Sequence, residues 1–373
     1  MKKNILSLVF VIAMSASFAA DVRDSFIVDA VYRNYIVHLP TSFNAANQYP
    51  LVLNLHGYTS NADQQMLYSG MNATADANNF IVVYPNGVAN YWNAFGNGAD
   101  DVKFLDSLIE KLSRTYNIDR TSVYGCGMSN GGFMSYSLAC QLSHKIAAIA
   151  SVTGTMSNWN LANCPISRKV PVMQIHGTTD PTVDYNTGVS AWGSVGVEAS
   201  LLFWIDTNSC SLVSDTIDVP NTNVADNCTA QLIRYRSCAQ GSEVYFYKIL
   251  GGEHTWPGAP ITIGVTNRDF NASTEIWNFF KRHKLQTATG IETIEDENKL
   301  NVFPNPFSNR LSINIENAET ASVTIYNSLG AIVYNGNVKS ESVINTQNWS
   351  SGIYFVTAKT TQGTNTKKLI KGE

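Results

Sequence analysis

The chain has 373 residues, enough for about two domains that each bury a core of their own. Charged residues make up only 14% and hydrophobic residues 44%, so the chain lacks the low hydrophobicity and high charge of a disordered protein. The net charge of −4 excludes nucleic-acid binding as a main function on electrostatic grounds, and a surface of low charge fits a secreted protein with a neutral partner.

The N-terminus predicts export from the cytoplasm. Lys2 and Lys3 precede an apolar run at residues 5–14, and small residues follow up to Ala20. This order is typical of a secretory signal peptide, which we place at residues 1–19. The apolar run is shorter than the ~20 residues that span a bilayer, and no other stretch is long and apolar enough, so we expect no membrane span.

The next segment, residues 20–285, alternates short apolar strands with helical patterns. Several strands are nearly continuous apolar runs, as in strands that are buried on both faces. The ranges that read as strands are 35–39, 51–55, 80–84, 122–125, 146–152, 170–175 and 244–249. Helical patterns occur at residues 101–112, and at 273–284 with Ser273 as the expected N-terminal cap. This alternation predicts an α/β domain with a doubly wound, mostly parallel sheet.

A polar, acidic linker is expected at residues 286–299, and the chain changes character after it. Residues 300–373 contain short strands of alternating pattern, separated by turn residues. These strands are expected at residues 311–315, 322–326, 331–334 and 352–356. Many short strands at this spacing predict a small antiparallel β-sandwich as a second domain.

Six cysteines lie between Cys126 and Cys238, all in the first predicted domain. They form no Cys-x-x-Cys pair and have no histidine cluster beside them, so no metal and no cofactor is expected. An even number in a secreted chain suggests up to three disulfides, with many pairings open. Our preferred pair is Cys210 with Cys238, whereas Cys126 lies inside an apolar strand and fits a buried thiol.

The most informative segment is residues 123–132, because it contains Gly-x-Ser-x-Gly as Gly127, Ser129 and Gly131. A predicted strand precedes the motif and a helical pattern at residues 133–140 follows it, which is the context of a nucleophile elbow. Such a turn holds its serine in a strained conformation, and the helix N-terminus directs free N–H groups at a developing oxyanion. Ser129 is therefore the predicted nucleophile.

A serine hydroxyl is a weak nucleophile and needs a base, and in the elbow fold the acid and the histidine follow the serine along the chain. Asp180 and His254 each lie on a loop that follows one of the predicted strands. Because the carboxyl ends of parallel strands share one edge of the sheet, Ser129, Asp180 and His254 are expected to converge as a catalytic triad. Asp184, on the same loop as Asp180, is the alternative acid.

An oxyanion hole needs two backbone donors. We expect one from the N–H of Asn130, next to the nucleophile, and the other from Tyr58, with Gly57 as the alternative. His56, at the end of the predicted strand 51–55, is expected to orient this loop by hydrogen bonding rather than to act as a base.

Two tryptophans, Trp92 and Trp256, fit two roles equally well. Aromatic side chains near a cleft can stack on sugar or phenyl rings, but a place in the core is equally natural. Both are therefore candidate substrate-binding residues.

Four segments carry a resemblance to a known family. They read His-Gly-Tyr at 56–58, Gly-Met-Ser-Asn-Gly-Gly at 127–132, His-Gly-Thr-Thr-Asp at 176–180 and Gly-Gly-Glu-His-Thr-Trp-Pro-Gly at 251–258. In this order they resemble the secreted polyhydroxybutyrate depolymerase and feruloyl esterase group of carbohydrate esterase family 1, over roughly residues 25–285. The resemblance implies an α/β-hydrolase fold and hydrolysis of an ester on an extracellular polymer or its fragments, and it supports the same triad. Cys126 departs from the pattern that we expect and leaves the disulfide map open.

The tail resembles a C-terminal type IX secretion sorting domain of Bacteroidota, over residues 300–373. The segments at 302–307, 325–330, 352–354 and 367–371 carry this resemblance. It implies that the type IX secretion machinery is a partner and that the protein is extracellular or on the cell surface. A carbohydrate-binding β-sandwich is the alternative. Such a domain needs exposed aromatic rings that stack on sugars, and Trp349 is the only tryptophan of the tail.

These predictions combine into a secreted serine esterase that cleaves feruloyl or acetyl groups from plant polysaccharide through an acyl-enzyme. Its expected partners are an ester-bearing polymer and the secretion machinery, with no nucleic acid. A polyhydroxybutyrate depolymerase is one alternative, and a non-catalytic polysaccharide-binding surface protein is another. Nothing in the sequence resembles the gate of a peptidase.

Overall fold

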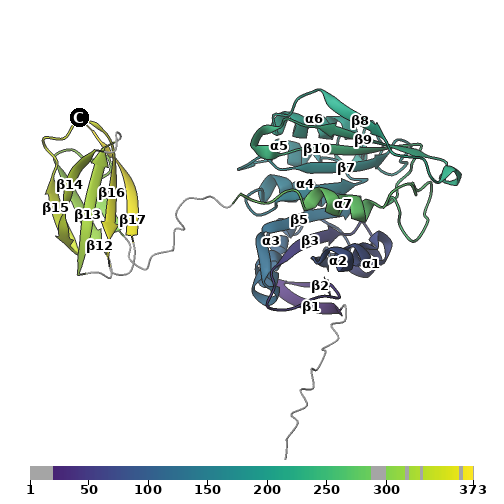
Figure 1. The fold of residues 1–373 in the computed structure, drawn as a ribbon, viewed down its shortest axis with the longest axis horizontal. Helices are drawn as coiled ribbons and strands as arrows, with labels where there is room; N and C mark the ends of the chain where they lie inside the picture. The colour runs from purple at the N-terminus through teal and green to yellow at the C-terminus, as the bar shows by residue number, and fades with distance from the viewer. Residues whose placement is uncertain (1–19, 287–299, 316–318, 328–330, 361–363, 373) are drawn as a thin grey trace, which may run out of the picture. The chain divides into compact units, whose positions relative to one another are not determined.

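The computed structural model describes residues 20–286, 300–315, 319–327, 331–360 and 364–372 (Figure 1). The predicted signal peptide and nearly all of the predicted linker lie outside these residues. The chain forms two compact units, Met1–Thr287 and Ala288–Glu373.

The first unit is built on one ten-stranded sheet. Its strands are β1 (Ala20–Val28), β2 (Val31–Leu39), β3 (Tyr49–Leu55), β4 (Ile81–Pro85), β5 (Ile118–Met128), β6 (Ala148–Val152), β7 (Val172–Gly177), β8 (Ser214–Asp218), β9 (Thr229–Tyr235) and β10 (Val244–Leu250). They are arranged in the order β1-β2-β4-β3-β5-β6-β7-β10-β9-β8. The strands from β4 to β10 in this order run parallel, whereas β1 and β2 at one edge and β9 and β8 at the other are antiparallel.

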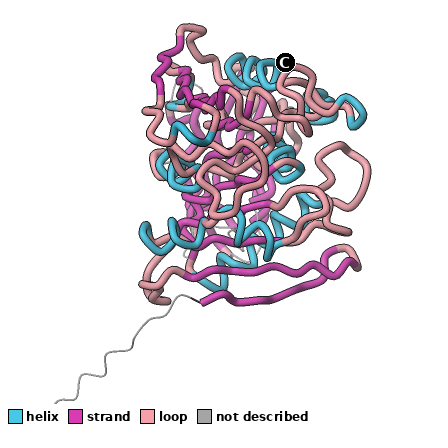
Figure 2. The backbone as a smooth tube through the Cα atoms, turned by 90° about the vertical axis from the view of Figure 1, so that its right-hand side faces the viewer, coloured by secondary structure: helices cyan, strands magenta, loops and turns pink. Residues whose placement is uncertain are grey.

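Helices cover both faces of this sheet, as Figure 2 shows. They are α1 (Ala62–Ser69), α2 (Met71–Asn78), α3 (Asp101–Tyr116), α4 (Asn130–Gln141), α5 (Asn158–Ala162), α6 (Val197–Thr207) and α7 (Ala272–Phe280). Leu51, Leu53 and Leu55 of β3 join a core cluster with α3, α4 and α6, and Val52 between them joins a second cluster with α1, α2 and α7. The predicted doubly wound sheet of an α/β-hydrolase is thereby confirmed.

Every strand predicted for this unit is present, with ends shifted by a few residues. The prediction lacks β1, β8 and β9, because these strands are partly exposed and carry many polar residues. No helix in the described part of the chain is long and apolar enough to cross a membrane.

The cap predicted at Ser273 is wrong, and the helix is shorter than predicted. α7 ends at Phe280, and its N-terminal cap is Asn271, whose side chain accepts from the Thr274 N–H at 3.0 Å. Ser273 lies inside the first turn, where its hydroxyl donates to Ser69 O at 2.8 Å. This bond fixes the helix to the end of α1, so the hydroxyl is not available as a cap.

The second unit consists of two antiparallel sheets around one core. Its strands are β11 (Leu300–Phe303), β12 (Arg310–Ile315), β13 (Thr320–Asn327), β14 (Ile332–Lys339), β15 (Glu341–Asn345), β16 (Gly352–Lys359) and β17 (Thr364–Lys371). One sheet has the order β11-β12-β15 and the other β14-β13-β16-β17. Leu311 and Ile313 of the first sheet share a buried cluster with Val323 and Val356 of the second. The predicted antiparallel tail is confirmed, although β11, β15 and β17 are additional to the prediction.

Candidate active site

The turn at Ser129 has the strained geometry that the Gly-x-Ser-x-Gly motif predicts. β5 ends at Met128, α4 begins at Asn130, and Ser129 between them has φ 55° and ψ −119°. A residue with a side chain rarely adopts a positive φ, and such strain is concentrated at functional sites. The Ser129 N–H donates to Val152 O at 2.8 Å, whereas the side chain makes no capping hydrogen bond with α4. Its hydroxyl is therefore available for chemistry.

Two glycines allow the strand and the helix to meet at this turn. A Cβ atom on Gly127 would lie 2.6 Å from the carbonyl carbon of Gly131, and one on Gly131 would lie 2.2 Å from Leu55 O in β3. Real Cβ atoms essentially never approach other atoms this closely. A side chain at either position would therefore push α4 away from the sheet and displace Ser129.

The structure brings Asp180 and His254 into direct contact. His254 Nδ1 donates to Asp180 Oδ2 at 2.7 Å, while Asp180 Oδ1 accepts from the N–H groups of Thr182 and Val183. The Asp180 side chain is fully buried, so its charge is balanced by these donors rather than by water. The alternative acid, Asp184, is exposed and hydrogen-bonds within its own turn. With Nδ1 bonded to Asp180, the second ring nitrogen of His254 is the one left to exchange a proton.

The loops that carry these two residues are joined by their backbones. A Cβ atom on Gly177 would lie 2.1 Å from Gly252 O, so this glycine allows the loop after β7 to touch the loop after β10. Thr179 donates to the same Gly252 oxygen through its N–H and its hydroxyl, at 3.0 and 2.9 Å. The Gly251 N–H donates to the Thr178 hydroxyl at 2.9 Å. These hydrogen bonds between the two loops fix the distance between Asp180 and His254.

His176 supports the loop that carries Asp180 by a hydrogen bond to its backbone. Gln174 Nε2 donates to His176 Nδ1 at 3.0 Å, so the ring carries its proton on Nε2 and donates it to Val183 O at 2.9 Å. Burial lowers the pKa of His176 to about 4, so the ring is neutral at pH 7. His176 Nε2 also lies 3.4 Å from Asp180 Oδ2, so both histidines face this carboxylate.

His56 orients the peptide between Gly57 and Tyr58. Its Nε2 accepts from the Gly87 N–H at 3.0 Å, so its proton is on Nδ1, which donates to Gly57 O at 2.7 Å. In a trans peptide the N–H points opposite to the C=O, so the Tyr58 N–H is turned away from His56. A Cβ atom on Gly57 would lie 3.5 Å from Ser129 Cβ, so this peptide lies beside the serine. Burial lowers the pKa of His56 to about 4, so it stays neutral and fits an orienting role.

The two backbone N–H groups predicted for the oxyanion hole, those of Tyr58 and Asn130, are both unpaired. Within the described ranges, neither group donates a hydrogen bond. Asn130 is fully buried, and a buried N–H without a partner costs free energy unless a ligand supplies the acceptor. The pair is therefore suited to bind a negatively charged oxygen next to Ser129.

A buried ion pair anchors the loop between β4 and α3, which sequence reasoning missed. Arg33 Nη2 donates to Asp101 Oδ1 at 2.6 Å, and Asp101 Oδ2 accepts from the Asn93 N–H at 2.7 Å. The same loop supplies the Gly87 N–H to His56, and Trp92 Nε1 donates to His56 O at 3.0 Å. The position of His56 thus depends on contacts that begin at Arg33.

Trp92 and Trp256 are both fully buried, which favours the packing role over substrate contact. Trp256 Nε1 donates to the Ser273 hydroxyl at 3.2 Å, so its polar atom is also bonded inside the protein. Two other aromatic side chains near Ser129 are exposed instead, Tyr58 at 50% and Trp192 at 40%. Trp192 was not predicted, although its place between Gly188 and Gly193 in a loop after Asp180 is a signal that the sequence contains.

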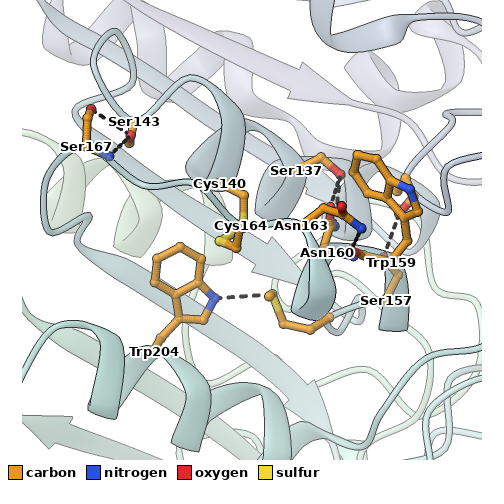
Figure 3. Close-up of a disulfide and its surroundings, with 12 residues drawn as sticks. Ser137, Cys140, Ser143, Ser157, Trp159, Asn160, Asn163, Cys164, Ser167 and Trp204 are labelled. Carbon is orange, nitrogen blue, oxygen red and sulfur yellow. Dashed lines mark hydrogen bonds between the residues drawn. A yellow bond between two sulfur atoms is a disulfide. The ribbon is translucent and has the colours of Figure 1, made fainter.

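A disulfide fastens the far end of the helix that begins at Asn130. Cys140, near the end of α4, is bonded to Cys164, just after α5 (Figure 3). The side chains of Ser137 and Asn160 hydrogen-bond to each other alongside it. The predicted pair Cys210–Cys238 is also present, and Cys126 is a buried free thiol as expected, with Cys228 as another. Among the described residues, no group of three or more His, Cys, Asp or Glu side chains is placed to hold a metal ion.

Known proteins resemble both parts of the chain. Residues 301–372 match the family described as "Secretion system C-terminal sorting domain". The chain therefore carries a type IX sorting domain, and its location is extracellular or on the cell surface.

Curated relatives of the first unit are esterases. The bifunctional acetylxylan esterase/xylanase XynS20E of Neocallimastix patriciarum is 29% identical over 226 residues, which are 60% of this chain but only 31% of that protein. Feruloyl esterase D of Neurospora crassa is 26% identical over 262 residues, which are 67% of this chain and 82% of that protein. Among solved structures, an acetyl xylan esterase from Aspergillus awamori has a TM-score of 0.48 at 14% identity, covering 63% of this chain and 94% of that one.

The family described as "Esterase PHB depolymerase" matches residues 33–238. This range contains the Ser129 turn and Asp180, and it spans more than half of the chain. The chain belongs to the PHB depolymerase esterase family and is a carboxylic ester hydrolase.

Proposed function

We propose that this protein is a serine esterase in which Ser129, His254 and Asp180 act as a catalytic triad. The observation that carries the proposal is the buried Asp180 carboxylate bonded to His254 Nδ1. The loops of these residues follow β7 and β10, which run parallel to β5, the strand that leads to Ser129. All three residues therefore follow the carboxyl ends of parallel strands, at the same end of the sheet.

The triad would act in two steps. Ser129 Oγ bonds to the acyl carbon of the ester while its proton passes to His254 Nε2, and His254 then gives this proton to the departing alcohol oxygen. Water next attacks the acyl-enzyme, gives a proton to His254, and releases the carboxylic acid as Ser129 takes the proton back. Asp180 holds the ring orientation and stabilises the charge that forms on it. The N–H groups of Tyr58 and Asn130 would stabilise the oxyanion in both steps.

Ser129→Ala tests this mechanism against the non-catalytic alternative. We expect the variant to lose release of p-nitrophenol from p-nitrophenyl acetate by at least about a factor of 10³. Asp184→Ala, which removes the alternative acid, should keep the activity, whereas Asp180→Ala should lose most of it. A fluorophosphonate probe should label the parent protein but not Ser129→Ala; an unlabelled parent with no turnover would favour a binding protein.

For the natural substrate we propose feruloyl or acetyl esters on plant polysaccharide. The relatives named acetylxylan esterase and feruloyl esterase support this choice, as do the sorting domain and the low charge of this chain. The name of the family itself favours polyhydroxybutyrate as the second candidate. The test compares release of ferulate from feruloylated polysaccharide, of acetate from acetylated polysaccharide and of 3-hydroxybutyrate from polyhydroxybutyrate. The polymer that is cleaved fastest identifies the substrate.

We also propose that the tail is a sorting signal for export and that it is removed after passage through the outer membrane. In this division, residues 1–19 are a signal peptide, 20–285 the esterase, 286–299 a linker and 300–373 the sorting domain. Deletion of residues 300–373 should keep the esterase inside the cell envelope. Normal export of the shortened chain would contradict this role.

A further inference from the structure

An unassigned group of aromatic side chains lies beside the Ser129 turn. It consists of Tyr58, Tyr91, Phe95 and Trp192, which we call the aromatic platform. The ring of Tyr58 contacts Trp192 at 5.4 Å between centroids and Tyr91 at 5.9 Å, and Trp192 also contacts Phe95 at 5.8 Å. Tyr58 and Trp192 are half-exposed, so each ring is held by neighbours on one side and open to solvent on the other.

Two contacts place this platform next to the reacting atoms. Tyr58 directly follows Gly57, whose Cα lies against the Ser129 side chain, since a Cβ there would lie 3.5 Å from Ser129 Cβ. Phe95 contacts Phe133, one turn beyond Ser129 on α4, at 5.1 Å between ring centroids. The aromatic platform therefore adjoins the Ser129 turn.

Hydrogen bonds hold the backbone of the loop that carries Trp192. Its backbone forms a short 3₁₀ turn at Ser190–Trp192, and the Trp192 N–H donates to Val189 O at 3.0 Å. The Ser194 hydroxyl accepts from the Val189 N–H, and Gly193 O accepts from the Asn158 N–H at 2.8 Å. A loop whose backbone is already ordered, with its ring in contact with Tyr58 and Phe95, loses less conformational entropy when a ligand stacks on the ring.

Exposed asparagines border the platform. Asn90 precedes Tyr91 and accepts from the Thr59 N–H through its carbonyl, Asn97 lies two residues after Phe95, and Asn158 lies beside Gly193 next to Trp192. Each side-chain amide offers both donors and an acceptor, as the hydroxyl groups of a sugar require. A polyester of 3-hydroxybutyrate offers acceptors only, so it can pair with the amide N–H groups but not with the amide oxygens.

We propose that the aromatic platform binds a pyranose ring of the polysaccharide next to the ester that Ser129 attacks. The flat C–H face of the sugar stacks on the Trp192 ring, the Tyr58 ring stands at 90° to that ring beside it, and the hydroxyls of the sugar bond to the surrounding amides. This inference rests on the proposed function for its substrate, but the stacking itself needs no catalysis. It can therefore be tested separately from turnover.

The test measures binding of ester-free xylohexaose to the full-length chain carrying Ser129→Ala, by calorimetry. In this background Trp192→Ala should bind xylohexaose at least about tenfold more weakly. Trp192→Leu, which keeps apolar bulk against Phe95 but has no ring, should lose as much. Leu212→Ala removes another apolar side chain that is 75% exposed, close to the Cys210–Cys238 disulfide, and should bind as the parent does.

Two outcomes overturn the proposal. One is a parent that binds no xylohexaose, and the other is equal affinity in the parent, Trp192→Ala and Trp192→Leu. Ferulate and polyhydroxybutyrate granules serve as competing ligands; a loss of binding confined to either of them would assign the platform to the acyl group or to a polyester instead. Failure of the esterase assignment has a different signature, which is an unchanged rate of p-nitrophenyl acetate cleavage in Ser129→Ala.

Discussion

The side-chain amide of Asn130 pairs in both directions with the backbone of Trp92. The Trp92 N–H donates to Asn130 Oδ1 at 2.6 Å, and Asn130 Nδ2 donates to Trp92 O at 3.0 Å. Both residues are fully buried, so neither bond competes with water. The pair fixes the residue whose N–H faces the proposed oxyanion, and it connects the nucleophile turn to the loop that also positions His56.

Asn130→Ala should therefore lower both stability and catalysis. Loss of the amide leaves the buried N–H of Trp92 without a partner, while the Trp92 C=O keeps only the Ala94 N–H at 2.9 Å, and we expect a cost of about 2 kcal/mol in unfolding free energy. The backbone at position 130 would also lose its orientation, and we expect kcat for p-nitrophenyl acetate to fall at least about tenfold with a smaller change in KM.

The chain offers a matched control for this variant. Asn208 makes the same two bonds with the backbone of Val170, at 3.2 and 2.7 Å, and is also fully buried. Asn208→Ala should destabilise the protein to a similar extent in urea but leave kcat unchanged. Equal kcat values for the two variants would mean that the Asn130 amide has only a structural role.

The parallel sheet and the nucleophile turn could be predicted because local sequence determines them. Buried parallel strands are short apolar runs, and the two glycines around Ser129 are required wherever a strand and a helix meet this closely. Ser129, Asp180 and His254 each follow a predicted strand, so the sequence also predicts that they lie on loops at the carboxyl ends of these strands.

The supporting contacts could not be predicted, because they join segments far apart in the sequence. Arg33 and Asp101 are 68 residues apart, and neither belongs to a motif. Trp92 fits the core or the surface equally well by its residue type, and only the packing around it decides. The antiparallel edge strands β1, β8 and β9 have mixed burial, so they lack a clear hydrophobic period.

Asp101→Asn should be strongly destabilising. Burial lowers the pKa of Arg33 and raises the pKa of Asp101, which means that both charges are costly to bury and depend on each other. Removal of one partner leaves the other charge uncompensated, and we expect a loss of about 3–5 kcal/mol in unfolding free energy.

Urea unfolding of Asp63→Asn provides the comparison. Asp63 pairs with Arg23, but both side chains are more than half exposed, so the loss should stay below about 1 kcal/mol. Similar losses in the two variants would show that the Arg33–Asp101 pair contributes no more than a surface ion pair.

Removal of the Cys140–Cys164 disulfide should destabilise the first unit. The bridge closes a loop of 24 residues, and its loss in Cys140→Ser/Cys164→Ser should cost about 3 kcal/mol through the entropy of the unfolded chain. Cys210→Ser/Cys238→Ser opens a loop of 28 residues and should cost about the same. The measurement is urea unfolding of the two double variants; a loss confined to one of them would contradict a purely entropic effect.

Stability should fall between pH 6.5 and pH 4 because two buried histidines resist protonation. Burial lowers the pKa of both His56 and His176 to about 4, below the ordinary value of 6.5. In this window the unfolded chain binds protons that the folded chain does not, so their contribution is complete above pH 6.5 and is lost as the pH falls toward 4. At 1.36 kcal/mol per pKa unit, the effect is on the order of 3 kcal/mol for each ring.

Urea unfolding at a series of pH values measures this slope. His176→Gln removes one of the two groups and should reduce the pH dependence in the window by about half, at whatever stability the variant has at pH 7. Carboxylates act at lower pH: hydrogen bonds from Arg120 and Lys145 lower the pKa of Glu110 to about 2, so its contribution is lost only as the pH falls below its ordinary value of 4.5. A slope that is unchanged in His176→Gln would show that the buried ring is protonated as readily in the folded chain as in the unfolded one.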